Sequence, residues 1–309
     1  MGDGLMTGVE FGSPVERVAA LWLHATGFNA MTYQSILAPL GLRTRVAAVD
    51  LRGHGRNTTP ADPPYPSWSV HVRDVIKWLE KYAPDGCVLG GHSMGGCVAT
   101  MVAGKRPDLV RGLVLVDPVI LSKAHYRRQH LFPFTLSSSR MARNAKKRRS
   151  TFGSFGEAQD RYANKKIFKS WREPFLADYL LDGLERVDDF GPESEEQIWE
   201  LLCTPKWEAA TFMAQRNRPW AALKKIKKKR IPLTILLPSS DAVMSRKAAD
   251  RVQNMIPGAR IKTIRGSSHF LPMEVPYSVR DELSEFISRL VEGFSAAEEG
   301  PVKRRLRGK

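Results

Sequence analysis

At residues 87–97 the chain reads Cys87-Val88-Leu89-Gly90-Gly91-His92-Ser93-Met94-Gly95-Gly96-Cys97. The apolar residues at its start predict a buried strand, and the small and apolar residues 97–103 predict a buried helix. Between them, Ser93 has a glycine two residues away on each side. A strand-to-helix turn with this spacing strains the serine backbone and leaves no room for side chains at the flanking positions. The stretch predicts a nucleophilic serine above a helix N-terminus, although a glycine-rich packing turn has the same pattern.

Further apolar runs place this turn in a sheet. Strand-like runs cover residues 17–23, 45–50, 87–89, 110–116, 231–237 and 260–264, and helical patterns cover 33–40 and 67–82. Runs that are apolar on both faces and alternate with helices are typical of a parallel sheet covered on both sides. The expected fold class is therefore α/β, with a mostly parallel sheet flanked by helices.

The alternation stops after Asp117 and resumes at Ile231. Residues 119–230 contain helical, charged and aromatic stretches interrupted by prolines, which predict a helical insertion. We therefore divide the chain into a core of residues 1–118 and 231–293, a helical cap of residues 119–230 and a basic tail of residues 294–309. An amphipathic helix over about residues 276–291 closes the core, and the tail is expected to be disordered.

The net charge of the 309 residues is +16, and it is unevenly distributed. Residues 119–172 carry +12, residues 173–208 carry −9, and residues 209–230 carry +8. Basic runs of this kind are most often solvated faces, and neither zinc-finger spacing nor aromatic interleaving accompanies them. We expect no specific nucleic-acid partner and at most weak association with an anionic surface.

Cysteine content and hydropathy bear on the compartment. The three cysteines have no CxxC spacing, no signal-peptide pattern opens the chain, and no apolar run approaches the roughly 20 residues that span a bilayer. The expectation is a soluble cytoplasmic protein, monomeric or homodimeric, that needs no cofactor or metal ion.

Two more residues with catalytic side chains follow predicted strands. Asp241 follows the run at 231–237 and His269 follows the run at 260–264, and the C-terminal ends of such strands share one edge of an open sheet. We expect Ser93 to be the nucleophile, His269 the general base and then acid, and Asp241 the carboxylate that orients the imidazole. Asp117 competes for the last role because it directly follows the preceding strand. Asp241 and His269 could also be ordinary turn and loop residues.

An oxyanion hole would complete this site. The residue after the nucleophile, Met94, should supply one backbone N–H, and the loop after the first strand should supply the other. In that loop we choose Thr26, with Gly27 or Phe28 as alternatives. We assign His24, Gly27, Phe28 and His92 to the substrate-binding surroundings, but the two histidines could instead bridge loop backbones.

Four motifs together resemble the α/β-hydrolase superfamily over about residues 10–292. They are the oxyanion loop at residues 24–27, in which Ala25 replaces the usual glycine, a D-x-R-G-x-G turn at 50–55, the serine turn at 91–96 and the histidine loop at 266–270. The resemblance implies an α/β-hydrolase fold with a helical cap. It also implies the branch that uses serine, which is similar to esterases and lipases.

The expected activity is cleavage of carboxylic esters through an acyl-enzyme intermediate. A lactonase, thioesterase or carbon–carbon bond hydrolase would use the same residues, and a non-catalytic ligand-binding protein on this fold would not need them. The substrate should be a small ester with an apolar acyl or alcohol part. Cap aromatics could line its pocket or simply pack the cap helices: Phe132, Phe134, Phe152, Phe155, Phe168, Trp171, Phe175, Trp199, Trp207, Phe212 and Trp220.

Overall fold

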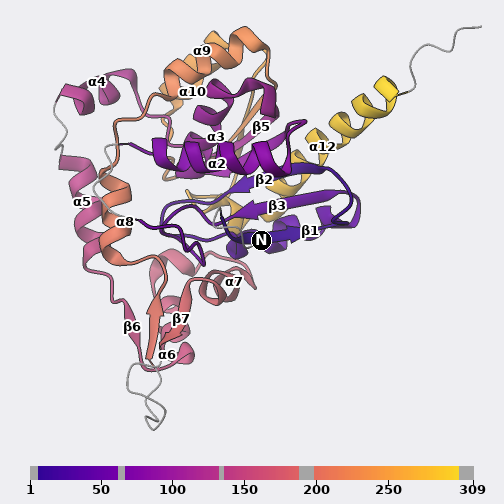
Figure 1. Cartoon of the computed structure of the whole chain (residues 1–309). Coiled ribbons are helices and arrows are strands. Elements are labelled where there is room, and N and C mark those ends of the chain that lie inside the picture. The colour runs from indigo at the N-terminus through magenta and orange to yellow at the C-terminus, as the bar shows by residue number, and fades with distance from the viewer. Residues whose placement is uncertain (1–5, 62–66, 132–135, 188–197, 299–309) are drawn as a thin grey trace, which may run out of the picture.

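A seven-stranded sheet forms the centre of the molecule in a computed structural model, which describes residues 6–61, 67–131, 136–187 and 198–298 (Figure 1). Its strand order is β1-β3-β2-β4-β5-β9-β10. The strands are β1 (Gly8–Phe11), β2 (Val18–Leu23), β3 (Arg45–Val49), β4 (Cys87–His92), β5 (Val110–Val116), β9 (Leu233–Pro238) and β10 (Arg260–Ile264). Among the described strand pairs of this sheet, β1–β3 is antiparallel and the others are parallel. The predicted mostly parallel α/β sheet is confirmed. The short edge strand β1 was not predicted.

Helices cover both faces of this sheet because successive side chains along its strands point alternately into two apolar layers, one on each face. In β2, Leu21 and Leu23 belong to one core cluster, and Trp22 belongs to the other. The first face packs against α2 (Ser69–Tyr82), α3 (Met94–Lys105), α9 (Pro219–Lys229) and α10 (Arg246–Met255). The second packs against α1 (Gln34–Leu37) and α12 (Pro276–Glu298). Single turns lie at η1 (Met31–Tyr33), η2 (Leu40–Leu42), η3 (Pro107–Leu109) and α11 (Leu271–Glu274).

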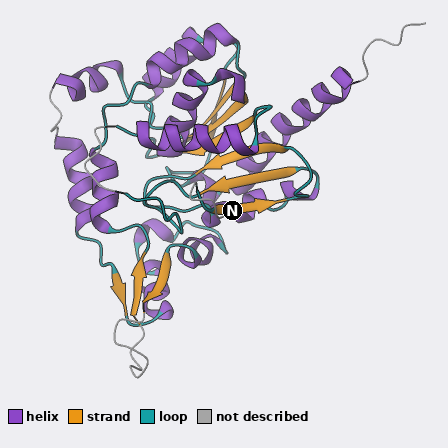
Figure 2. Cartoon of the chain, viewed as in Figure 1, coloured by secondary structure: helices purple, strands orange, loops and turns teal. Residues whose placement is uncertain are grey.

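A mixed insertion separates β5 from β9, and Figure 2 shows both helices and strands in it. The helices are α4 (Lys123–Leu131), α5 (Leu136–Lys146), α6 (Phe155–Ala163), η4 (Lys166–Phe168), α7 (Phe175–Leu181) and α8 (Pro205–Met213). An antiparallel sheet of β6 (Thr151–Phe152), β8 (Ile198–Leu201) and β7 (Leu184–Val187) completes it. The sequence pattern predicted the helices and missed this small sheet.

Helix α9 belongs to the layer that covers the main sheet. Leu223 and Ile226 are fully buried in the first core cluster, and a Cβ on Gly104 of α3 would lie only 2.6 Å from the Ala222 Cβ. The predicted cap of residues 119–230 therefore extends too far, since the part that leaves the sheet ends before Pro219. At the C-terminus, α12 continues to Glu298, past the predicted start of the tail at 294. Residues 299–309, Phe132 and Phe134 lie outside the described residues.

Helices α9 and α10, with α4 beside them, lie at the top of Figure 1 and carry several basic residues. Lys123 and Arg251 both lie over the Trp220 ring, at 5.5 and 5.7 Å from its centroid. Five lysines of α9 are exposed: Lys224, Lys225, Lys227, Lys228 and Lys229. We call this surface the basic face. Among the described residues, no helix combines the length and the apolar character needed to cross a bilayer.

Candidate active site

The turn between β4 and α3 holds Ser93 in a conformation that few L-residues adopt. Its φ is 55° and its ψ is −113°, and its side chain emerges at the N-terminus of α3. A Cβ on Gly91 would lie 2.6 Å from the Gly95 carbonyl carbon, and one on Gly95 would lie 2.1 Å from the Leu23 carbonyl oxygen. Both contacts are with backbone, so neither neighbour can yield. The two glycines of the pentapeptide are therefore required by close packing, as the motif predicts.

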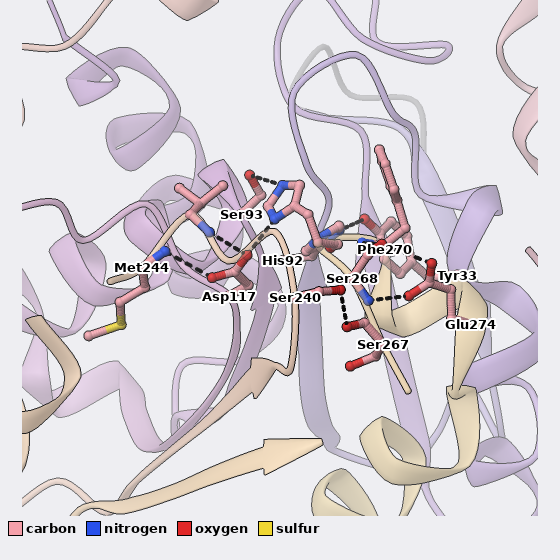
Figure 3. Close-up of polar contacts among 12 residues, drawn as sticks. Tyr33, His92, Ser93, Asp117, Ser240, Met244, Ser267, Ser268, Phe270 and Glu274 are labelled. Carbon is pink, nitrogen blue, oxygen red and sulfur yellow. Dashed lines mark hydrogen bonds and ion pairs between the residues drawn. The ribbon is translucent and has the colours of Figure 1, made fainter. Parts of the chain in front are cut away.

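His269 joins the serine to a buried carboxylate. Its Nε2 lies 3.1 Å from Ser93 Oγ, and its Nδ1 lies 2.6 Å from Asp117 Oδ2. Asp117 is fully buried, directly after β5, and its carboxylate also accepts backbone N–H groups of Val243 and Met244, each at 2.9 Å. Dashed lines in Figure 3 join Ser93 and Asp117 to the two nitrogens of one imidazole ring. The carboxylate fixes Nδ1–H, which leaves Nε2 free to accept the serine proton.

This geometry corrects the prediction for Asp241. The Asp241 side chain is exposed, and it is Asp117 that contacts His269. Strands β5 and β9 are neighbours in the sheet, so both aspartates lie near the same edge. Both also have positive φ values, 37° for Asp117 and 51° for Asp241, so this backbone feature does not separate them. The loop around Asp241 instead supplies the two N–H groups that hold Asp117.

His92 and Glu274 hold the histidine loop from two sides. The His92 Nε2 lies 2.8 Å from the His269 carbonyl oxygen, and its Nδ1 lies 2.8 Å from the Tyr33 hydroxyl. The Nε2–H therefore donates to the carbonyl, and Nδ1 accepts from the tyrosine. Glu274 accepts the N–H and the hydroxyl of Ser268, at 2.6 and 2.8 Å. These contacts fix the backbone on both sides of the imidazole (Figure 3).

His24 supports a second loop from inside the protein. Its Nε2 accepts the Leu51 N–H at 2.9 Å, and its Nδ1 donates to the Ala25 carbonyl at 2.7 Å. Its ring lies 4.9 Å from that of His54, and burial lowers the pKa of each to about 3. His24 and His92 are fully buried and both nitrogens of each ring are bonded, so the prediction that they contact substrate is wrong. They bridge loop backbones.

The two segments chosen for the oxyanion hole lie side by side. The Thr26 hydroxyl contacts Met94 Sδ at 3.5 Å, and Met94 is the first residue of α3. The first N–H groups of a helix have no partner within it, which makes them available to an anion. Gly27 is buried with φ +78°, so the loop turns sharply directly after Thr26. The oxyanion hole formed by the Thr26 and Met94 N–H groups stays a prediction.

Aromatic side chains from core and insertion meet beside the histidine. The Phe28 ring stacks on Trp171 at 5.6 Å and lies 6.3 Å from Phe270 and 6.1 Å from His92. Phe28 and Phe270 are half-buried, and Trp171 comes from the predicted cap. Of the four predicted substrate neighbours, Phe28 therefore has both the position and the exposure to meet a ligand.

Several supporting residues had no signal in the sequence. Tyr33, Glu274 and Glu208 belong to no motif. Tyr33 acts through His92, 59 residues away, and Glu208 contacts Arg148, 60 residues away, whereas Glu274 acts through Ser268, six residues away. Asp117 did have a signal, because it directly follows a buried strand. Its strand-end position could have ranked it equal to Asp241.

Comparisons with known proteins agree with this fold. A family model described as the alpha/beta hydrolase family matches residues 20–282. A mouse sn-1-specific diacylglycerol lipase is 25% identical over 274 residues, 87% of this chain and 81% of its own. An esterase of Mycobacterium tuberculosis is 35% identical over 114 residues, 37% of each chain.

Solved structures give the same fold at lower identity. The crystal structure of E-2-(acetamidomethylene)succinate hydrolase has a TM-score of 0.73 at 18% identity, covering 92% of this chain and 95% of that one. The structure of the M. tuberculosis esterase has a TM-score of 0.65 at 21% identity, covering 94% and 89%. Because the family model spans most of the chain and relatives named esterase and lipase accompany it, the chain belongs to the alpha/beta hydrolase family.

Proposed function

We propose that this protein is a serine hydrolase that cleaves carboxylic esters through an acyl-enzyme intermediate. The observation that carries the proposal is the hydrogen-bonded series from Ser93 Oγ through His269 to the buried Asp117, with the serine strained at a helix N-terminus. A merely structural turn needs neither of these two hydrogen bonds nor the strained serine. Names of relatives, lipase and esterase, support an ester as the substrate class.

The proposed cycle starts with proton transfer from Ser93 Oγ to His269 Nε2 as the oxygen attacks the ester carbonyl. Asp117 stabilises the imidazolium that forms, and N–H groups of Thr26 and Met94 would bind the oxyanion. The C–O bond then breaks, and His269 gives its proton to the leaving alcohol. A water molecule, deprotonated by His269, attacks the acyl-enzyme; collapse of the second intermediate releases the carboxylic acid and regenerates the serine.

An ester with an apolar acyl or alcohol part fits the surroundings best. The Phe270 ring lies 5.7 Å from that of His269, and the rings of Phe28 and Trp171 pack beside Phe270. Apolar and aromatic linings are typical of small-molecule sites. Thioesters and lactones also react at a carbonyl carbon, so Ser93 would attack them in the same way as it attacks carboxylic esters. We place carboxylic esters first because of the esterase and lipase names among the relatives.

Covalent labelling tests the nucleophile directly. A fluorophosphonate probe should label the folded wild-type protein at Ser93, and Ser93→Ala should abolish the signal. Ser240→Ala is the matched control, because this serine lies at the same edge but bonds the Ser267 carbonyl. A panel of p-nitrophenyl esters with increasing acyl length, thioesters and lactones then ranks substrates. Folded wild-type protein that neither labels nor turns over any of them would refute the proposal.

A further inference from the structure

One buried cation joins four segments of the insertion. The Arg148 guanidinium forms an ion pair with Glu208 of α8 and donates to the hydroxyls of Tyr162 and Tyr179, at 2.7 and 2.9 Å. Tyr162 belongs to α6 and Tyr179 to α7. The side chains of Arg148 and Glu208 are only 17% and 10% exposed. A buried pair of this kind is costly to break, because removing one partner leaves the other charge uncompensated.

This cluster rests on the loop that contains the proposed oxyanion donor. A Cβ on Gly27 would lie 2.7 Å from Glu208 Oε1 and 3.4 Å from Arg148 Nη1. The Tyr179 carbonyl also accepts the Asn29 side-chain N–H at 2.9 Å, and its ring lies 5.3 Å from Phe28. Residues 27–29 are thus held by insertion residues directly after Thr26.

The sign of the charges matters at this position. A bare carboxylate beside Gly27 would oppose the negative charge that develops on a substrate oxygen held by the neighbouring Thr26 N–H. Arg148 neutralises that carboxylate. Burial strengthens both the repulsion by the Glu208 carboxylate and its neutralisation by Arg148, because solvent screens charges in this cluster poorly.

We propose that Arg148 and Glu208 are positioning residues for the oxyanion loop: the pair holds residues 27–29 in place while the guanidinium cancels the carboxylate's charge. The proposal rests on the ester hydrolase function above. It predicts that the insertion acts on the rate of the chemical step as well as on substrate choice.

Four variants test it: Arg148→Met, Glu208→Gln, their combination, and Arg149→Met as the control. Arg149 neighbours Arg148 in sequence and pairs with Glu157 at 2.7 Å, but its side chain is 42% exposed. For each variant, kcat and KM for one ester and the rate of fluorophosphonate labelling are compared with the wild type. Thermal melts identify the folded proteins.

Arg148→Met should lower kcat at least tenfold with less than a threefold change in KM, and the double variant should recover part of that loss. Arg149→Met should stay within twofold of the wild type. Where Arg148→Met does not fold, Arg148→Lys keeps the charge and should retain kcat within threefold. Any one of three results overturns the proposal. These are a folded Arg148→Met variant with wild-type kcat, a double variant whose kcat does not exceed that of Arg148→Met, and a tenfold loss of kcat in Arg148→Lys. Wild-type activity and labelling separately decide the proposed function.

Discussion

Replacement of Asp117 by asparagine tests the acid that the structure selects. The amide has one accepting oxygen, whereas the Asp117 carboxylate accepts from Val243, Met244 and His269. The amide nitrogen of the Asp117→Asn variant can also donate to His269 Nδ1, which would place the imidazole proton on Nε2 and block proton transfer from Ser93. An aspartate-to-asparagine change at the equivalent position of a serine protease lowers kcat by about 10⁴, and we expect a loss of similar order.

The same change should also lower stability. One of the two backbone N–H groups loses its carboxylate acceptor, and an unsatisfied buried donor costs about 1–3 kcal/mol. Asp117→Asn should therefore remain folded with a lower urea midpoint, so that the lost activity is not a consequence of unfolding. Because Asp241 is exposed, Asp241→Asn should stay within twofold of the wild type in kcat and midpoint.

The assay is ester hydrolysis at pH 7 to 8, with urea unfolding followed by tryptophan fluorescence. If folded Asp117→Asn keeps a tenth or more of wild-type kcat while Asp241→Asn loses most of it, the assignment from the structure is wrong. Loss in neither variant would show that His269 needs no carboxylate partner.

Three further predictions concern the rest of the molecule. Burial lowers the pKa of His24, His54 and His71 to about 3, so between pH 7 and pH 5 protonation of the unfolded chain should remove about 2 kcal/mol of stability for each. Burial raises the pKa of Asp50 to about 6, so its protonation in the folded protein should add back roughly 1 kcal/mol of stability over the same pH range. An unchanged urea midpoint at pH 5 would contradict the expected net loss. Gly95→Ala should cost at least about 2 kcal/mol in unfolding free energy, because its Cβ meets the Leu23 carbonyl; Gly258→Ala, with open space around it, should be neutral. The basic face should bind phosphatidylserine vesicles weakly at low salt and release them by about 0.2 M salt. Lys225→Glu with Lys228→Glu should abolish this binding, whereas Lys166→Glu with Lys169→Glu, at and directly after η4, should not. Binding to duplex DNA that persists at about 0.2 M salt would contradict this prediction and indicate a nucleic-acid partner.

Local patterns were enough to predict the sheet and two members of the site. Buried strands are apolar on both faces, so β2, β3, β4, β5 and β9 could be recognised without knowing their neighbours. Edge strand β1 and the strands of the small sheet are two to four residues long, too short for such a pattern. Helix α9 has lysines on one face and Leu223 and Ile226 on the other, a pattern that suits either cap or core.

The sequence by itself was enough to predict Ser93 and His269 as members of the candidate site, because the glycine spacing and the order of strand ends are properties of short segments. Only the tertiary structure distinguished Asp117 from Asp241. Both follow neighbouring strands, and the packing of separate loops brings Asp117 to His269 and the N–H groups of Val243 and Met244 to Asp117. The tertiary structure also brought Arg148 to Glu208 across 60 residues and placed the pair against Gly27. Such contacts arise from the packing of separate segments, and no spacing within one segment specifies them.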